Sequence, residues 1–585
     1  MSITPRGMSV QEAYRNFSDD KFLVNRRYQR KLVWTVSEKQ YLIDSIQKGL
    51  PIPLILLAQT NEGKYEIIDG LQRLNAIFSF IENRFEIGEK YFDVNQFSRA
   101  KQFGDAGAFS YQTDSEKLIS PEICANILDY QLAVTIYPSS GEDEVTDIFG
   151  RINSGGKQLS PQEKRQAGML DSFSEIVRVI SSEIRGDSSQ DLVDLSDMPE
   201  ISIDSNRENI GYGLKAEDIF WCSHGILWKS QLRDSEDEEM VSDILASIIL
   251  EEPIARSKEL FDKIYEKKGD LNNDLNAKLK SYGEDRLKHE VSVTLSIIRD
   301  VFEKEKTTIR GIVNPKSRNP VKGSFFAIFM SFFNLVVKEE KSPAQNDKII
   351  SAISGLQKEM IASAKFSKTE DRIKNVNKTT GLIQPYFVKK DPPVLRHGAG
   401  LSLDFENSIR RSKVESSRYE CKQGLCELAN NRNVNNDIYN KIISTICGIA
   451  NLGPDSDGFL FLGVADKKKD ADRINQLDGI SPIEINNRFV VGIDRELTLT
   501  KKTIDEYVKL VIGQIKSSDL SEPLKSQTIS QIDVVDYRGL TVVRIRIPAQ
   551  RELSFIGKDC YVRENSETIL IEGPKILALS KLFIN

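Results

Sequence analysis

The turn at Asp69 and Gly70 carries residue types that can bind an anion. A strand would deliver Asp69, Gly70 would permit a tight turn, and Gln72 and Arg73 would occupy the first turn of the next helix. Free backbone N–H groups lie there, so a phosphate could dock with Arg73 as a clamp, while Asp69 could hold a metal or a water. The alternative is structural: Asp69 caps the helix and Arg73 pairs with it.

A second candidate for phosphate contact is the loop Phe149–Gly156, which contains Arg151 and Asn153. Its Ser-Gly-Gly end could wrap backbone amides around a phosphate, or the loop is only a flexible turn. The residues after the loop predict a helix with a complete N-terminal cap, formed by Ser160, Pro161 and Glu163.

These residues need a mixed α/β scaffold, which the pattern from about residue 20 to 170 predicts. Ser37 and Gln40 have capping-box spacing before a helix that Pro51 and Pro53 end. The apolar residues of that helix are Tyr41, Leu42, Ile46 and Leu50. Strands are expected at Leu54–Leu57 and Tyr65–Ile68, followed by a helix with one apolar face of Leu74, Ile77, Phe78 and Ile81.

Taken in order, these motifs resemble the N-terminal domain of GmrSD-type modification-dependent restriction proteins. The motifs are Tyr28-Gln29-Arg30 before Trp34, Pro51-Ile-Pro53, Asp69-Gly70-x-Gln72-Arg73, and Phe149-x-Arg151-Ile-Asn153-Ser-Gly-Gly. The resemblance is close over about residues 10–170 and looser to about 390. It implies a ParB-like fold and, as in some members, nucleotide hydrolysis or sensing of modified DNA. It also implies a site lined by Tyr28, Gln29, Arg30, Asp69, Gly70, Gln72, Arg73, Arg151 and Asn153.

Two departures from that family limit the expected chemistry. Leu71 stands where the family usually has Gln, which removes a group that could orient water or phosphate, so binding is expected more firmly than hydrolysis. Many relatives end in an HNH nuclease domain, which needs several histidines. The three scattered histidines of this chain, His224, His289 and His397, cannot supply one.

The region from about 170 to 390 is expected to be mainly helical. The acidic run Asp234–Glu239 predicts a solvated loop or helix end. The apolar run Phe325–Val337 is too short to span a bilayer and predicts a buried helix. The Pro- and Gly-containing stretch from Lys389 to Gly400 predicts a linker.

The last third of the sequence returns to an α/β pattern and resembles the Schlafen-AlbA domain over about residues 410–580. The motifs that carry this likeness are Glu420-x-Lys422, Ile449-Ala450-Asn451, Gly458-x-x-x-x-Gly463-Val464-x-Asp466 and Tyr561-x-Arg563-x-x-Ser566. One departure is Glu552–Phe555, which replaces the family's usual proline and aromatic and leaves the local pocket shape open.

By this resemblance, Glu415, Glu420 and Asp466 match acids with which some members cleave RNA. Such a trio would bind Mg²⁺ or Mn²⁺ and polarise a water, and Lys422, on the same strand face as Glu420, could neutralise the scissile phosphate. Other members only bind nucleic acid or serve as interaction modules. Likewise Arg544, Arg546 and Arg563 form either a phosphate-facing surface or ordinary sheet-edge charges.

The length, net charge and cysteine content of the chain limit the classes of protein to which it can belong. At 585 residues the chain predicts three or four compact units, and its net charge of −6 argues against non-specific coating of DNA but permits a local basic groove. Six scattered cysteines without a C-x-x-C pair predict reduced thiols in a cytoplasmic protein and no structural zinc. The residues Met1–Gln11 lack the apolar stretch of a signal peptide, and no membrane association is expected.

The fold class predicted is therefore α+β multidomain: a ParB-like α/β domain (1–170), a helical region (171–390), a linker (391–408) and a Schlafen-AlbA-like α/β domain (409–585). The leading hypothesis is an anti-phage or restriction-type effector that senses a nucleotide, such as a nucleoside triphosphate, or DNA, modified or not, and cleaves DNA or RNA with a divalent metal, Mg²⁺ or Mn²⁺. The alternatives are a non-catalytic nucleic-acid-binding regulator, or an N-terminal NTPase or nickase with a C-terminal binding module. The sequence leaves the oligomeric state open, a homo-oligomer included.

Overall fold

The computed structural model describes residues 4–26, 31–60, 62–138, 160–166, 169–187, 192–198, 200–202, 213–361, 368–389, 405–406, 408–409, 412, 416–430, 432–435, 437–454, 457–485, 487–564 and 566–583. The chain divides into two compact units. Unit 1 comprises Met1–Lys288, Thr308–Ser331 and Ser351–Leu382, and unit 2 comprises His289–Thr307, Phe332–Ile350 and Ile383–Asn585. The four-part division expected from the sequence stays a prediction.

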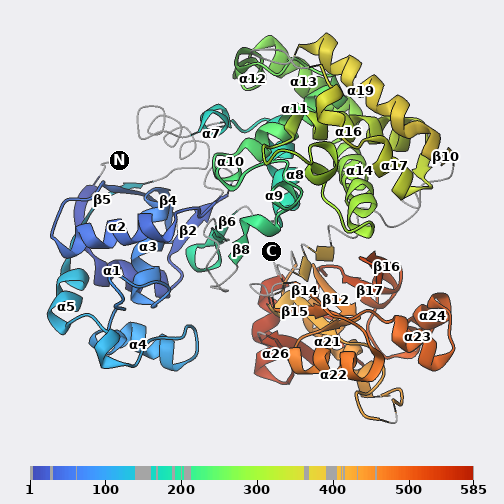
Figure 1. The fold of residues 1–585 in the computed structure, drawn as a ribbon. Coiled ribbons are helices and arrows are strands. Elements are labelled where there is room, and N and C mark those ends of the chain that lie inside the picture. Colours follow the sequence, from blue (N-terminus) through green and yellow to red (C-terminus); the bar gives the residue numbers. More distant parts are fainter. Residues whose placement is uncertain are drawn as a thin grey trace. The chain divides into compact units, whose positions relative to one another are not determined.

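Unit 1 opens with a six-stranded mixed sheet (Figure 1). In spatial order its strands are β1 (Thr4–Ser9), β5 (Gln131–Pro138), β3 (Ile55–Gln59), β4 (Tyr65–Asp69), β2 (Phe22–Asn25) and β6 (Leu192–Asp194). The pairs β3–β5 and β2–β4 are parallel and the others antiparallel. The helices of this part are α1 (Val10–Ser18), α2 (Val36–Gln47), α3 (Leu71–Ile81), α4 (Ser98–Asp105), α5 (Pro121–Asp129) and α7 (Pro161–Gln166).

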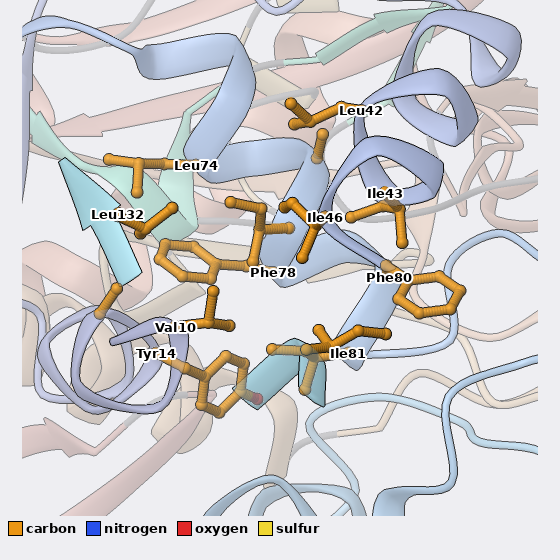
Figure 2. Close-up of a cluster of buried hydrophobic side chains, with 14 of the residues drawn as sticks. Val10, Tyr14, Leu42, Ile43, Ile46, Leu74, Phe78, Phe80, Ile81 and Leu132 are labelled. Carbon is orange, nitrogen blue, oxygen red and sulfur yellow. The ribbon is translucent and has the colours of Figure 1, made fainter. Parts of the chain in front are cut away.

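The core of this sheet domain is built by α3 and the helices beside it. Phe78, Phe80 and Ile81 of α3 are almost fully buried, and they pack with apolar residues from α1, α2 and β5 (Figure 2). Because the predicted strand, turn and helix are all present as β4, Gly70 and α3, the scaffold around Asp69 is confirmed.

The start of α2 differs from the expected one. The cap is Thr35, not Ser37: Thr35 Oγ1 accepts from Glu38 N at 3.2 Å, and Thr35 N donates to Glu38 Oε2 at 2.8 Å. Two overlapping box spacings exist here, and the charged Glu38 also reaches the Arg233 guanidinium. The outer pair therefore forms the reciprocal cap, and the helix begins at Val36.

The rest of unit 1 is mainly helical. Its elements are α8 (Ser172–Arg185), β7 (Glu200–Ser202), β8 (Gly213–Lys215), α9 (Phe220–Ser223), α10 (Lys229–Arg233), α11 (Glu236–Ile249), α12 (Lys258–Ile264), α13 (Asp270–Tyr282), α15 (Ile309–Val313), α16 (Lys322–Phe333), α18 (Leu356–Glu359) and α19 (Thr369–Ile383). α16 passes into unit 2 at Phe332 and continues there into a π-helical turn, Asn334–Lys338. Its phenylalanines are buried, as the apolar run predicts.

The acidic run Asp234–Glu239 is a helix start, and the expectation that it is solvated holds for Asp234 but is wrong for Asp237 and Glu238. α11 begins at Glu236, and the side chains of Asp237 and Glu238 are completely buried. Cations from distant parts of unit 1 surround them, which the local sequence does not reveal.

Unit 2 combines α14 (Glu284–Lys304), α17 (Asn346–Ala352) and the β9–β10 pair with the C-terminal α/β part. The strands β9 to β12 are β9 (Lys341–Pro343), β10 (Phe387–Lys389), β11 (Tyr419–Lys422) and β12 (Gly458–Leu462). The remaining strands are β13 (Val464–Ala465), β14 (Ile483–Ile485), β15 (Arg488–Val490), β16 (Ile532–Tyr537), β17 (Leu540–Ile547), β18 (Cys560–Glu564) and β19 (Glu567–Ile571). The helices are α21 (Asp437–Ala450), α22 (Lys468–Asp478), α23 (Asp494–Thr500), α24 (Ile504–Ser517), α25 (Leu524–Ile529) and α26 (Pro574–Ser580).

The central sheet of unit 2 has the order β11-β12-β17-β16, with β11 parallel to β12. Alternation along β12 sends Leu460 and Leu462 into the cluster with α21, while Phe461 joins a second cluster on the other face. All six cysteines are described and none forms a disulfide. In the described ranges, no helix combines the length and the apolar character needed to cross a membrane.

Candidate functional sites

The β4–α3 turn requires glycine at position 70. Gly70 has a φ of 106°, and an added Cβ would lie 3.0 Å from Ile55 Cγ1. α3 then begins without a side-chain hydrogen bond to its first amides. Asp69 does not cap the helix; its Oδ2 pairs with Arg73 Nη2 at 2.8 Å. The Asp69–Arg73 ion pair agrees with the structural alternative, in which the two residues pair with each other. The uncapped start of α3 agrees with the other alternative, in which free amides bind an anion.

Gln72 holds the chain segment that follows residue 30. Its Nε2 donates to Lys31 O at 2.7 Å, and its Oε1 accepts from Val33 N at 3.2 Å and from Trp34 N at 3.3 Å. One side chain thus fixes three backbone groups. Gln72 acts here as a positioning residue for the segment 31–34.

Leu71 packs in the hydrophobic core of the sheet domain and is only 6% exposed. In this chain the side chain at position 71 therefore faces the core rather than a ligand. Leu71, in place of the family's usual Gln, therefore mainly changes the packing of the core of the sheet domain.

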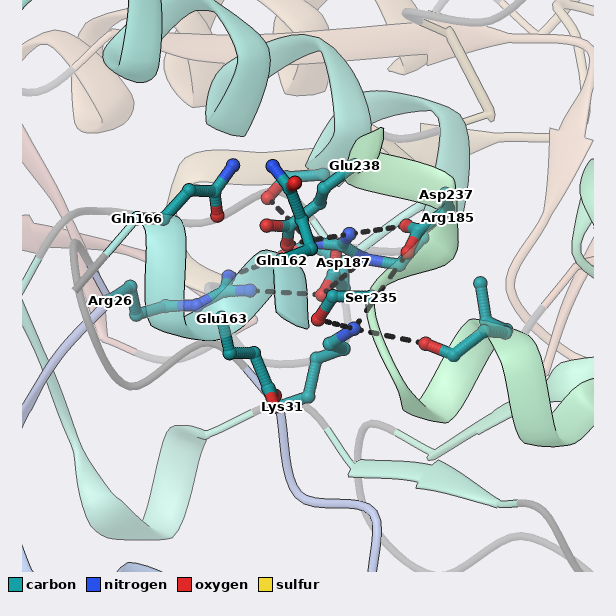
Figure 3. Close-up of polar contacts among 12 residues, drawn as sticks. Arg26, Lys31, Gln162, Glu163, Gln166, Arg185, Asp187, Ser235, Asp237 and Glu238 are labelled. Carbon is teal, nitrogen blue, oxygen red and sulfur yellow. Dashed lines mark hydrogen bonds and ion pairs between the residues drawn. The ribbon is translucent and has the colours of Figure 1, made fainter. Parts of the chain in front are cut away.

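Close to this turn lies a buried cluster of charges, shown in Figure 3. Arg185 is its centre: Nε lies 3.1 Å from Asp187 Oδ1, and Nη1 lies 2.6 Å from Asp237 Oδ2 and 3.2 Å from Glu238 Oε1. Burial acts to lower the pKa of Arg185, but the three acids outweigh it and raise that pKa. Arg185 therefore stays charged, and its guanidinium bridges α8 to α11.

Two further cations enter this cluster from the sheet domain. Arg26, just after β2, pairs with Asp187 at 3.0 Å between Nη2 and Oδ2. Lys31 Nζ donates to Ser235 Oγ at 2.8 Å and to Leu232 O at 3.0 Å, and lies 3.8 Å from Asp237 Oδ1. Among the described residues, three buried cations therefore face three buried acids.

Several predicted site residues of the N-terminal domain lie outside the described residues. These are Tyr28, Gln29, Arg30, Arg151 and Asn153. Ser160, Pro161 and Glu163 do form the expected cap of α7: Ser160 N donates to Glu163 Oε2 at 2.8 Å, and Glu163 N donates to Ser160 Oγ at 3.3 Å.

In unit 2, strand β11 brings Glu420 and Lys422 onto one face, as expected from their spacing. Glu420 Oε1 accepts from Lys422 Nζ, and Glu420 Oε2 pairs with Arg563 Nη1 at 2.9 Å. The Arg563 side chain is 2% exposed, and it also donates to Ser417 O, Tyr419 O and Thr568 Oγ1. Arg563 thus ties the β18–β19 hairpin to the start of β11 and orients Glu420.

Asp466 follows β13 and lies near this pair. Gly463 N donates to Lys422 O at 2.9 Å, which fixes the turn toward Asp466 against the end of β11. Burial raises the pKa of Asp466 and the charge of Glu420 raises it further, while Arg488, its direct partner, lowers it. The Asp466 side chain is nevertheless 38% exposed, so it can meet a ligand from solvent.

The complete carboxylate trio stays a prediction because Glu415 lies outside the described residues. Among the residues that are described, no three His, Cys, Asp or Glu side chains are grouped so as to hold a metal ion. The structure thus brings Glu420, Lys422, Asp466 and Arg563 into one region of unit 2.

Arg544 and Arg546, the other two candidates for a phosphate-facing surface, each form an ion pair with an aspartate. Arg544 Nη2 lies 2.9 Å from Asp533 Oδ2, and Arg546 Nη2 lies 2.5 Å from Asp457 Oδ2. Both arginines lie on β17, an interior strand of the central sheet, so they are paired charges on the sheet faces and not sheet-edge charges.

The buried cluster around Arg185 was not foreseen from the sequence. Arg185 ends a helix whose buried face carries Phe173, Ile176, Val177, Ile180 and Ile184. A charged residue on the continuation of such an apolar face is the signal that could have indicated a buried partner.

Comparison with known proteins bears on one end of the chain. Residues 11–170 match the family model of the GmrSD restriction endonuclease, N-terminal domain. This confirms the resemblance stated for that range. No curated protein and no solved structure was found to match.

Proposed function

We propose that this protein is a restriction-type defence nuclease. Its N-terminal domain would sense a nucleotide or modified DNA, and its C-terminal part would cleave nucleic acid with a divalent metal. The observation that carries the proposal is the match of residues 11–170 to a domain of restriction endonucleases. DNA is accordingly the substrate proposed first, with RNA as the alternative.

For the sensing step, the proposed site is the turn at Asp69 and Arg73. The uncapped start of α3 offers amide donors, and Arg73 offers a guanidinium already oriented by Asp69 at 2.8 Å. The ligand class is a nucleoside triphosphate or a DNA phosphate. Tyr28, Gln29, Arg30, Arg151 and Asn153 belong to this proposal through the family resemblance.

For the cleavage step, the proposed residues are Glu420, Asp466 and Glu415, in a Schlafen-AlbA-like domain. Carboxylate oxygens are the ligands that Mg²⁺ and Mn²⁺ prefer, so the donor chemistry fits. A bound metal would polarise a water for attack on phosphorus. Lys422 pairs with Glu420, so it would turn to the scissile phosphate when Glu420 binds a metal.

The surroundings of Asp466 favour a polyanion as substrate. Lys467, Lys468 and Lys469 follow it directly at the start of α22, and all three are exposed. Lysines of this kind contact phosphates without reading sequence.

The experiment is a cleavage assay with the full chain. Plasmid DNA, modified phage DNA, single-stranded DNA and tRNA are incubated with Mg²⁺ or Mn²⁺, with and without EDTA. Metal-dependent cleavage of at least one substrate is expected. Intact substrates under every condition would refute the nuclease.

A second candidate is a regulator that binds nucleic acid without cutting it. It is favoured by the two cations on Glu420, because both oxygens of that carboxylate are engaged by Lys422 and Arg563. Tight binding to duplex DNA without any cleavage in the same assay would support this function instead.

A further inference from the structure

The buried charges of unit 1 form a chain of ion pairs, here called the circuit, that runs from Arg26 to Lys31. Asp187 joins Arg26 to Arg185, and Asp237 joins Arg185 to Lys31. Arg26 and Lys31 are the residues on either side of the segment 27–30. Both flanks of that segment are thus tied to one guanidinium, that of Arg185 (Figure 3).

The circuit extends to the β4–α3 turn through Gln72. Its amide bonds Lys31 O at 2.7 Å, while the neighbouring Arg73 pairs with Asp69. Lys31 in turn bonds Leu232 O and Ser235 Oγ at the start of α11. A displacement at the first turn of α3 therefore reaches α11 through one lysine.

Burial gives these contacts their stiffness. The side chains of Arg185, Asp187 and Asp237 are all 0% exposed, so no water can replace a lost partner. Asp237 Oδ1 accepts no hydrogen bond among the described residues, and the Lys31 ammonium 3.8 Å away is the cation that faces it. Moving Lys31 would take one cation away from the Asp237 carboxylate and leave it with Arg185.

We propose that Lys31 and Arg185 are positioning residues that couple the first turn of α3 to helices α8 and α11. The link makes the helical part of unit 1 respond to a ligand at the turn, and that last step rests on the proposed sensing function. The sequence match ends at residue 170, so the coupling uses Arg185, Asp187 and Asp237 from outside the matched domain.

The first test needs no ligand and follows hydrogen exchange in the full chain. Gln72→Ala removes the bonds to Lys31 O and its neighbours, and Lys31→Met removes the ammonium but keeps the aliphatic stem. Each is expected to speed exchange of the first α11 amides at least tenfold. The double variant should exchange no faster than Lys31→Met, because Gln72 reaches α11 through the Lys31 ammonium, which Lys31→Met has already removed.

Two matched controls separate coupling from general loosening. Gln40→Ala removes another side-chain amide bond to a backbone carbonyl of the sheet domain, Gln40 Nε2 to Glu86 O at 2.7 Å, so α11 should exchange as in the wild type. Arg372→Met breaks another buried pair on α11, with Asp243 at 2.8 Å, and should leave exchange in α3 unchanged. Unchanged α11 exchange in Gln72→Ala, or effects of Gln72→Ala and Lys31→Met that simply multiply, would overturn the proposal.

The second test measures affinity for ATP with Mg²⁺ and for a duplex DNA. Lys31→Met should lower the affinity for the probe that the wild type binds at least tenfold. Lys31→Arg should recover most of that affinity, and Arg372→Met should have the affinity of the wild type. Equal losses in Lys31→Met and Arg372→Met would reduce Lys31 to a structural role and overturn the proposal. If the wild type binds neither probe, the sensing function fails, and the exchange experiment still decides the coupling.

Discussion

Two clusters of acids in this protein differ in what surrounds their carboxylates. In unit 1, Asp187 and Asp237 are fully buried and face Arg26, Lys31 and Arg185. In unit 2, Asp466 keeps 38% of its side chain exposed and has one direct cation, Arg488. The first arrangement fixes backbone segments, and the second leaves an acid within reach of a substrate.

The comparison shows that acid content alone does not distinguish structural from chemical carboxylates. A buried acid that faces cations is closed to a ligand from solvent, and losing one of those cations is costly. An acid at a sheet end with solvent access can exchange its cation partner for a metal ion. If the two clusters differ in this way, substitutions in unit 1 should change stability and substitutions in unit 2 should change cleavage.

The largest effect on stability is expected for Arg185→Met. It leaves Asp187, Asp237 and Glu238 buried without their common cation, which should lower the free energy of unfolding by about 3–5 kcal/mol. All three tryptophans, Trp34, Trp221 and Trp228, lie in unit 1, so their fluorescence in a urea titration reports on this unit. A loss below about 1 kcal/mol would place the cluster in the same class as a surface network.

Lys422→Met should affect cleavage rather than folding. The Lys422 side chain is 23% exposed and Arg563 remains on Glu420, so the fold should survive. If Lys422 neutralises the scissile phosphate, the rate should fall roughly 100-fold. A lysine of the same unit with an exposed side chain, Lys501, gives the control Lys501→Met, which should cleave at the wild-type rate. Equal rates in both variants would remove Lys422 from the reaction.

Glu82 tests how burial affects the charge of a carboxylate that pairs with Arg84. Burial raises its pKa, and Arg84 and the Tyr14 hydroxyl only partly oppose this. Because the folded pKa lies above the unfolded one, the contribution to stability is complete below the unfolded value and is lost as pH rises through the folded value. Glu82→Gln should flatten this part of the profile and equal or exceed the wild type at neutral pH. If the stability of Glu82→Gln instead falls more steeply with pH than that of the wild type, the carboxylate is stabilised in its charged form.

The smallest effect is expected for Arg546→Ala. Its pair with Asp457 is about half exposed on both sides, at 50% and 40%, so the free energy of unfolding should change by at most about 1 kcal/mol. Arg544, two residues along the same strand, is 7% exposed and also lies over the Phe459 ring. Arg544→Ala should therefore cost more in thermal unfolding, and the reverse order would contradict the role given to burial.

Local patterns in the sequence predicted the elements that local chemistry decides. Gly70 and the apolar spacing after it marked the β4–α3 turn, and Ser160 with Glu163 marked the cap of α7. The start of α2 was missed by two residues because Thr35–Glu38 and Ser37–Gln40 offer overlapping spacings, and the Arg233 partner of Glu38 is remote in sequence.

The buried cluster could not be predicted from local patterns. Asp237 looks like a solvated acid in its own segment, and its partners Arg185 and Lys31 lie 52 and 206 positions away by residue number. In unit 2, by contrast, the spacing of Glu420 and Lys422 on a strand was enough to place them together. What separates the two cases is whether the partner is local or is supplied by tertiary packing.

The most direct test of the proposed nuclease compares cleavage by the wild type, Glu420→Gln, Asp466→Asn and the double variant, with Mn²⁺ and the substrate that the wild type cuts. Both single changes keep side-chain shape and remove one charge at the proposed metal. Each should lower the rate at least about 100-fold, and the double variant should be little worse than either, because the groups act as one centre. Cleavage by the double variant at the wild-type rate would contradict the assignment of the cutting centre to Glu420 and Asp466.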